Sequence, residues 1–267
     1  MRHVVVLGCL LACSACAITE PWPAQPIASL TVTTFNVAGD AALADPRVAR
    51  AITVELVGLA PDVALLQECA ACERVLATLP APYALFHRAG SELAFVYDAS
   101  RWDVVADGAL RLGNDDDGWG RREARWIELL SRDDDAPVVA YSTHFCVPIR
   151  SADDPCDTDR QLAYARRVVA QLGRRDVPVV LGGDLNVFDG FAAGPVVAAL
   201  EAGGLVDPLR AVDAAATATF EGNAWAPPGR LDYLFATPPV EVLAASIATA
   251  SASDHLPVTA TLAFPAR

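Results

Sequence analysis

Short apolar runs rich in β-branched residues recur along the chain from residue 30 almost to its end. Runs of this length and composition are typical of β-strands. We expect strands at residues 30–37, 63–67, 83–87, 93–98, 102–106, 125–130, 138–143, 178–182, 231–236, 241–248 and 257–264.

Helical spacing of apolar residues is confined to three segments. Residues 46–60 place Val48, Ile52 and Leu56 on one helical face, and residues 158–172 and 192–202 are also predicted to be helical. Some strands follow one another directly, whereas others are separated by a helix. This order favours mixed β-sheets packed on each other, with helices outside. The 267 residues are enough for one large domain.

The first residues have the pattern of an export signal. A basic start is followed by an apolar run from Val4 to Ala12, which is too short to span a bilayer. Small residues follow, so that segment 1–16 resembles a bacterial lipoprotein signal with Cys16 or Cys13 as the lipidated residue. We expect an extracytoplasmic protein, either a periplasmic or outer-membrane lipoprotein or, without lipid, a secreted one.

Residues 17–29 contain three prolines and no periodic pattern, so we expect a tether before a catalytic domain at residues 30–267. If Cys16 carries the lipid, Cys69, Cys72, Cys146 and Cys156 remain, an even number suited to two disulfides in an oxidising compartment. Short separations favour the pairs Cys69–Cys72 and Cys146–Cys156. A redox pair or half of a zinc site is the alternative for Cys69 and Cys72.

Polar side chains stand at the ends of several predicted strands, where the apolar interiors do not require them. They are Asn36, Glu68, His144, Asp184 with Asn186, Asp232, and Asp254 with His255. Taken one at a time, each is also explained as a turn former, a helix cap or a core histidine. The six motifs together are harder to explain in that way.

In order and spacing, these motifs resemble the endonuclease/exonuclease/phosphatase family over about residues 30–264. The most specific parts are Gly182-Gly183-Asp184-Leu185-Asn186 and Ser253-Asp254-His255-Leu256-Pro257. The resemblance implies an α/β (α+β) fold, a four-layer α-β-β-α sandwich of two packed mixed β-sheets. It also implies a metal-dependent phosphoric ester hydrolase, acting on a phosphoester in nucleic acid, lipid or a small molecule.

Hydrolysis of a phosphodiester builds negative charge on the phosphoryl oxygens, which a hard cation stabilises. We expect Mg²⁺, with Mn²⁺ as a substitute, held by Glu68 with support from Asn36 and Asp254. His255 is the expected general base because an imidazole titrates near neutral pH. By the resemblance, Asp232 orients His255.

Asp184 and Asn186 are expected to orient the water and bind a phosphoryl oxygen, although Asp184 competes with His255 as general base. His144 would donate a hydrogen bond or a proton to the phosphoryl or leaving-group oxygen. The resemblance implies a glutamate partner for His144, and Glu123 is the candidate. The alternative is that Glu123 is a solvated strand residue opposite Arg121 or Arg125.

The net charge of −13 gives no overall attraction for a polyanion. Arg122 and Arg125, with nearby Trp119 and Trp126, are expected to bind substrate and give weak support to a nuclease. A sphingomyelinase-like enzyme and an inositol-phosphate phosphatase are alternatives, as is an inactive binding protein on the same fold. We expect a monomer.

Overall fold

The computed structural model describes residues 26–113, 120–148, 156–187, 194–213, 218–222 and 227–265. The expected signal segment, both candidate lipidation cysteines and most of the expected tether lie outside these residues. Within the described ranges, no helix is long and apolar enough to cross a membrane.

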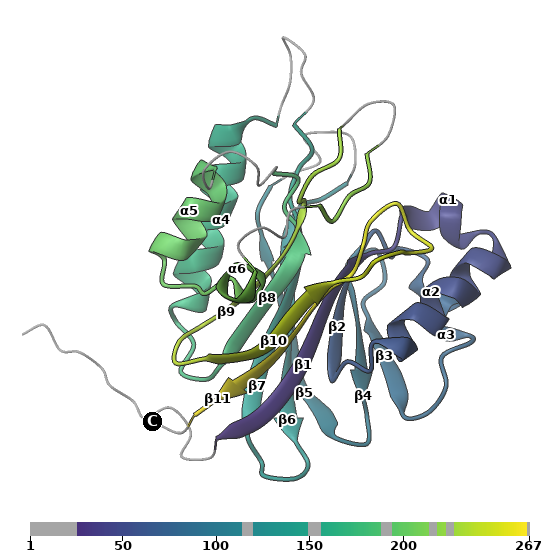
Figure 1. Cartoon of the computed structure of the whole chain (residues 1–267), viewed down its shortest axis with the longest axis horizontal. Coiled ribbons are helices and arrows are strands. Elements are labelled where there is room, and N and C mark those ends of the chain that lie inside the picture. Colours follow the sequence, from purple (N-terminus) through teal and green to yellow (C-terminus); the bar gives the residue numbers. More distant parts are fainter. Residues whose placement is uncertain are drawn as a thin grey trace, which may run out of the picture.

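Two mixed β-sheets pack face to face (Figure 1). The six-stranded sheet has the order β10-β11-β1-β2-β4-β3, and the five-stranded sheet has the order β5-β6-β7-β8-β9. In the first sheet the bounds are β1 Ile27–Asn36, β2 Val63–Gln67, β3 Tyr83–His87, β4 Ala94–Asp98, β10 Glu241–Ile247 and β11 Val258–Phe264. In the second they are β5 Trp102–Arg111, β6 Glu123–Ser131, β7 Pro137–His144, β8 Val179–Asp184 and β9 Asp232–Ala236.

Helices cover the outer faces of both sheets, which confirms the expected α-β-β-α sandwich. Figure 1 shows α1, α2 and α3 beside the six-stranded sheet and α4 and α5 beside the five-stranded sheet. Their bounds are α1 Gly39–Leu43, α2 Pro46–Gly58, α3 Cys72–Leu76, α4 Thr158–Leu172, α5 Pro195–Ala202 and α6 Pro208–Val212. Asp45 caps α2 and Asp157 caps α4, each through a side-chain oxygen that accepts a backbone N–H of the first turn.

The main core lies between the sheets. Leu30, Val32 and Leu65 of the first sheet belong to one buried cluster with Ile127 and Val138 of the second. Each such side chain contributes about 1.5–3 kcal/mol by leaving water. This packing fixes which face of each strand turns inward.

One parallel pair lies at the centre of each sheet, β1 with β2 and β7 with β8. Parallel strands end at the same edge of a sheet, so Asn36 is level with Gln67 and His144 is level with Asp184. Asp184 is also level with Asp232 at the start of the antiparallel β9. The polar residues at these strand ends are far apart in the sequence, but they therefore meet at one end of the sandwich.

Two glycines allow close packing near this end. A Cβ on Gly182 would lie 2.7 Å from Leu65 Cδ1 of the opposite sheet, and a Cβ on Gly183 would lie 2.1 Å from the Thr143 carbonyl oxygen. No larger residue fits either position without moving a neighbour.

Some element boundaries differ from the sequence expectation. β1 begins at Ile27, before the expected start of the domain, and β5 continues to Arg111. β5 passes through Gly108, although glycine is typical of turns. The glycine leaves room for the Trp126 ring, since a Cβ there would lie 2.6 Å from a ring atom. The short helices α1, α3 and α6 have five residues each, too few to show a helical period.

Candidate active site

Asp184 is the centre of the polar cluster at the end of the sandwich. Its Oδ2 atom accepts a hydrogen bond from Asn36 Nδ2 at 3.0 Å and lies 3.6 Å from His144 Nε2 and 3.8 Å from His255 Nε2. Its side chain is buried. Burial raises the pKa of Asp184 and Asp232 adds to this, while the two imidazoles oppose it.

His255 is held by Asp232. Its Nδ1 lies 2.8 Å from Asp232 Oδ2, which also accepts a hydrogen bond from Thr219 Oγ1 at 2.7 Å. Burial lowers the pKa of His255, but Asp232, Asp184 and Asp254 outweigh it and raise this pKa to about 10. The contact with Asp232 leaves the Nε2 side of the ring facing Asp184.

His144 is held by Glu92, a residue that the sequence did not indicate. Glu92 Oε2 lies 3.1 Å from His144 Nδ1, and Glu92 Oε1 accepts a hydrogen bond from Arg122 Nη1 at 2.9 Å. Burial raises the pKa of Glu92, but His144 and Arg122 outweigh it, so that this pKa is lowered. Burial lowers the pKa of His144, and the charge of Glu92 overcomes this and raises it.

The expectation that Glu123 orients His144 is wrong. Glu123 Oε1 instead accepts hydrogen bonds from Ser91 Oγ at 2.8 Å and Arg125 Nε at 3.1 Å. Glu92 stands just before β4 and ends no predicted strand, so the only signal for it was a carboxylate beside a buried strand. Glu123 and Arg125 point to the same side of β6, and the carboxylate of Glu123 is bound by this arginine and by Ser91.

The expectation that Arg122 binds substrate is also wrong, because its side chain is only 1% exposed and its guanidinium is paired with Glu92. Arg125 forms an ion pair with Glu123, and both side chains are largely buried. Trp126 packs below α4, with Arg175 4.1 Å from its ring centre. Trp119 lies outside the described residues. Of these arginines, only Arg122 supports the polar cluster, through its ion pair with Glu92.

A divalent metal fits beside Glu68. Ligand atoms of Glu68, His144 and Asp184 all lie within 4.8 Å of one another. Asn36 Nδ2 donates to Glu68 Oε1 at 2.9 Å, and Glu68 has a positive φ of 56° that turns its side chain at the end of β2. A Cβ on Gly39 would stand 3.0 Å from Glu68 Oε2, so the glycine keeps space open beside this carboxylate.

The carboxylate oxygens of Glu68 and Asp184 are donors that suit Mg²⁺ or Mn²⁺. Asp254, expected as a further ligand, lies outside this group and is exposed, with its Oδ1 3.4 Å from Ser253 Oγ. Its charge acts on the pKa of His255 instead.

The model of the Endonuclease/Exonuclease/phosphatase family matches residues 33–255, which contain every strand-end motif described above. The chain belongs to this family. The match confirms the expected family and enzyme class, and the fold agrees with solved members of the endonuclease/exonuclease/phosphatase family.

A family protein from Bacteroides thetaiotaomicron is 22% identical, with a TM-score of 0.68 over 91% of this chain and 97% of that one. A mannosyl-6-phosphatase from the same organism is 21% identical, with a TM-score of 0.66 over 88% of this chain and 100% of that one. D. rerio TDP2, complexed with a single-strand DNA product, is 18% identical, with a TM-score of 0.68 over 88% and 98%. No curated protein matches the chain.

Asn186 lies shortly after β8, beside the candidate site. It has a positive φ of 51°, a conformation that asparagine adopts more readily than most residues. Its backbone N–H donates to Asp184 Oδ1 at 2.8 Å, and its side-chain nitrogen donates to the Phe145 carbonyl at 3.0 Å. The loop after Asp184 is thereby fixed against the loop after His144.

Two serines connect helix α2 to the loop that carries His255. Glu55 Oε2 accepts a hydrogen bond from Ser251 Oγ at 3.0 Å, and Ser251 Oγ accepts one from the Ser253 N–H at 3.0 Å. Ser253 Oγ donates to the Asn36 carbonyl at 2.8 Å and accepts from the His255 N–H at 3.1 Å. Glu55 is thus linked by hydrogen bonds through two serines to the backbone of His255.

The sulfur atoms of Cys69 and Cys72 are bonded, as are those of Cys146 and Cys156. Cys69 follows Glu68 directly, and its N–H donates to the Glu92 carbonyl at 2.8 Å. This backbone hydrogen bond joins the segments that carry Glu68 and Glu92, and the first disulfide lies at the junction.

Proposed function

We propose that this member of the family is an extracytoplasmic, Mg²⁺-dependent phosphodiesterase of the nuclease type. The observation that carries the proposal is the pair of imidazoles facing Asp184 Oδ2, each held at Nδ1 by its own carboxylate. Such an arrangement leaves both Nε2 atoms directed at one point, where a phosphoryl group and a water would be bound.

His255 takes the proton from the attacking water through Nε2. Asp232 keeps Nδ1 protonated, orients the ring and stabilises the imidazolium that forms. Asp184 and Asn186 orient the water. Asp184 is itself a competing base, and burial, which raises its pKa, makes it a better proton acceptor.

His144 donates through Nε2 toward a phosphoryl or leaving-group oxygen. The raised pKa of His144 favours the protonated form that this role requires. Glu68, with Asn36 and Asp184 around it, would hold Mg²⁺ or Mn²⁺. When bound, the ion neutralises charge on the phosphoryl oxygens.

A base with a pKa of about 10 is protonated at neutral pH, so His255 needs further positive charge nearby before it can accept a proton. Of the carboxylates that raise this pKa, Asp184 also belongs to the candidate metal position beside Glu68. A divalent ion held there would oppose the effect of these carboxylates and would lower the pKa of His255 toward the working range.

The decisive experiment measures hydrolysis of bis-p-nitrophenyl phosphate and plasmid DNA with Mg²⁺ or Mn²⁺. We expect activity that EDTA abolishes and that His255→Ala reduces at least a thousandfold, on the order of a missing general base. Undiminished activity in EDTA or in His255→Ala would contradict the mechanism.

A small phosphomonoester is the second candidate substrate. The internal pairing of Arg122 and Arg125 favours it, because these residues then offer no surface to a nucleic-acid backbone. A metal-supplemented panel of DNA, RNA, sphingomyelin, inositol phosphates and sugar phosphates separates these classes. Cleavage of a sugar phosphate or sphingomyelin with inert DNA would replace the nuclease assignment.

Export and lipidation are supported by the apolar leader and by the two disulfides, which suit an oxidising compartment. We expect labelled palmitate to be incorporated into the full chain and to be lost in Cys16→Ala. Loss in Cys13→Ala instead would move the lipid site, and no labelling of any variant would favour plain secretion.

A further inference from the structure

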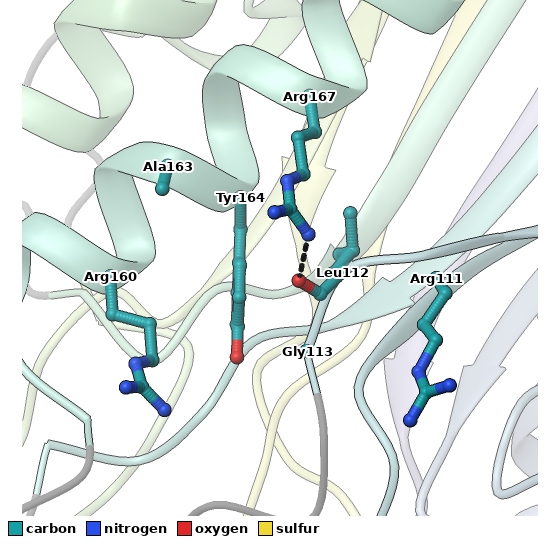
Figure 2. A pocket seen from close by; sticks show the side chains of 7 residues that line it. All are labelled: Arg111, Leu112, Gly113, Arg160, Ala163, Tyr164 and Arg167. Carbon is teal, nitrogen blue, oxygen red and sulfur yellow. Dashed lines mark hydrogen bonds between the residues drawn. The ribbon is translucent and has the colours of Figure 1, made fainter.

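Arginine side chains link neighbouring elements at several places in this chain. Arg167, for example, is exposed on α4, and its Nη1 donates to the Leu112 carbonyl at 2.6 Å and ties α4 to the end of β5 (Figure 2). Arg230 differs from such a surface link, because its side chain is only 1% exposed. It stands two residues before Asp232, the carboxylate that holds His255. A charge buried to this extent requires a partner.

Asp207 is the partner of Arg230. Nη2 of Arg230 donates to Asp207 Oδ1 at 2.9 Å, and Nη1 lies 2.8 Å from Asp207 Oδ2. The Asp207 side chain is also 1% exposed. Asp207 is itself fixed, since its Oδ1 accepts the N–H groups of Leu209 and Arg210 in the first turn of α6, at 3.0 and 3.2 Å. The ion pair therefore attaches the segment before β9 to α6.

The Arg230 side chain also contacts the first residues of β9. Its Nε donates to the Asp232 carbonyl at 3.4 Å, and its guanidinium carbon lies 4.2 Å from the centre of the Tyr233 ring. The Tyr233 hydroxyl donates in turn to the Arg230 carbonyl at 3.4 Å. Arg230 thus holds the backbone that carries Asp232.

The direction of the Asp232 carboxylate depends on this backbone. Thr219 and His255 contact its Oδ2, but among the residues that the structure describes no group forms a hydrogen bond with its Oδ1. A carboxylate that is held at one oxygen can turn about that oxygen, so the position of its backbone decides where it points. A shift of the start of β9 would therefore change the 2.8 Å contact between Asp232 and His255.

Stability alone does not explain a buried ion pair. Removing two charges from water is costly, and apolar side chains often replace such a pair with no loss of stability. An ion pair supplies a fixed direction, since a planar guanidinium contacts a carboxylate at two defined points. This geometry suits a residue that sets the position of another.

We propose that Arg230 and Asp207 are positioning residues for the reaction. Asp207 fixes Arg230 from α6, Arg230 fixes the start of β9, and Asp232 is thereby held against His255. The effect on catalysis rests on the proposed function. The contact between Asp232 and His255 can be measured without it.

The first experiment measures this contact in the absence of substrate and metal. The proton on His255 Nδ1 lies in a buried hydrogen bond to a carboxylate, and we expect it to give a low-field NMR resonance that is lost in His255→Ala. Arg230→Met/Asp207→Asn removes both charges and keeps the oxygen that caps α6. In this double variant the resonance should shift or broaden beyond detection, at a melting temperature within a few degrees of that of the wild type.

Arg101→Met is the matched control. It breaks the ion pair of Asp62, which is also buried and lies at the opposite end of β2 from Glu68. We expect it to leave the His255 resonance in place. An equal change of the resonance in Arg101→Met would mean that any broken ion pair has this effect, and would overturn the proposal.

The second experiment measures hydrolysis of bis-p-nitrophenyl phosphate in a cycle with Asp232→Asn. We expect Arg230→Met/Asp207→Asn to lower kcat about tenfold with little change in KM, because a small misplacement near the reacting atoms is costly while substrate contacts remain. In the Asp232→Asn background the same change should lower kcat by no more than about twofold, since the effect acts through Asp232. Equal losses in both backgrounds would mean that the pair acts only on the fold as a whole.

Arg230→Lys covers the case in which the double variant does not fold. It keeps a charge beside Asp207 but loses the planar group that contacts Asp232 and Tyr233, so kcat should fall severalfold, again only where Asp232 is present. An unmoved resonance or an unchanged kcat, in whichever of the two variants folds, would overturn the proposal. A moved resonance in a protein inactive on every substrate would contradict the proposed function and leave the positioning of Asp232 standing.

Discussion

Asp232 Oδ2 lies 2.8 Å from His255 Nδ1, and because Asp232 is fully buried, solvent does not compete for this contact. In Asp232→Asn the carboxylate charge is lost while the shape is kept. We expect kcat to fall on the order of a thousandfold, because the ring loses its orientation and the imidazolium loses its counter-charge.

The same change lowers the pKa of His255 from about 10, since Asp232 is the largest influence that raises it. Titration of the His255 ring by NMR, without metal, measures the shift. A pKa that stays near 10 in Asp232→Asn would show that Asp184 and Asp254 are sufficient to hold the proton.

Glu92 and Glu123 offer a matched pair, because only Glu92 contacts His144. We expect Glu92→Gln to lower kcat about a hundredfold, in the range of a misoriented general acid. It should also destabilise the fold by about 3 kcal/mol in urea unfolding, since Arg122 is left buried with its charge uncompensated. Comparable loss of kcat in Glu123→Gln would contradict the assignment of Glu92.

The pH dependence of stability follows from the lowered pKa of Glu92. A carboxylate with a lowered folded-state pKa stabilises the fold above its ordinary value of 4.5, and the stabilisation is lost as pH falls through the folded-state pKa. We therefore expect the free energies of unfolding of wild type and Glu92→Gln to converge as pH is lowered below 4.5. A constant difference between them across this range would exclude the linkage.

Gly39 and Gly90 allow the space beside Glu68 to be tested separately from backbone strain. Both have positive φ, 74° and 80°, but only at Gly39 would a new Cβ approach another group, Glu68 Oε2 at 3.0 Å. Each alanine substitution should cost about 1 kcal/mol of stability. Only Gly39→Ala should raise the Mg²⁺ concentration needed for half-maximal activity, about tenfold, and an equal rise in Gly90→Ala would exclude a specific effect on Glu68.

Glu55 is a positioning residue, acting on His255 through Ser251 and Ser253. Burial raises the pKa of Glu55, while its hydrogen bonds from Ala252 and Ser251 oppose this. We expect Glu55→Ala to lower kcat about tenfold with little change in KM, because the histidine loop shifts while substrate contacts remain. Glu55→Gln keeps an acceptor oxygen and should restore most of kcat, and Arg50→Ala on the exposed side of α2 is the control. Equal losses in the alanine and glutamine variants would mean that the hydrogen bonds through the two serines do not set the position of His255.

The strand-end residues could be predicted because their positions follow from local pattern and from one rule of sheets. Asn36, His144 and Asp184 each end a recognisable apolar run, and parallel strands end at the same edge. Their meeting at Asp184 Oδ2 requires only that the two sheets pack with these ends together.

Glu92 and Glu55 could not be predicted in this way. Glu92 reaches His144 across 52 positions of the sequence and Glu55 reaches Ser251 across 196, from a turn and a helix face that carry no motif. Arg122 was misassigned for a related reason, because burial of an arginine depends on a partner, here Glu92, from a distant part of the sequence. For Glu92, Glu55 and Arg122, tertiary packing determines which partner the side chain contacts.

The two glycines before Asp184 are explained by packing alone, since neither gives a side chain to the reaction. The pattern that marks the family in this segment is thus partly a requirement of two sheets approaching each other. A relative that replaced Asp184 and kept Gly182 and Gly183 would still form the sandwich and still resemble an enzyme by its motif. Active and inactive relatives are therefore distinguished by whether each carboxylate and imidazole of the site is present. The two glycines do not distinguish them.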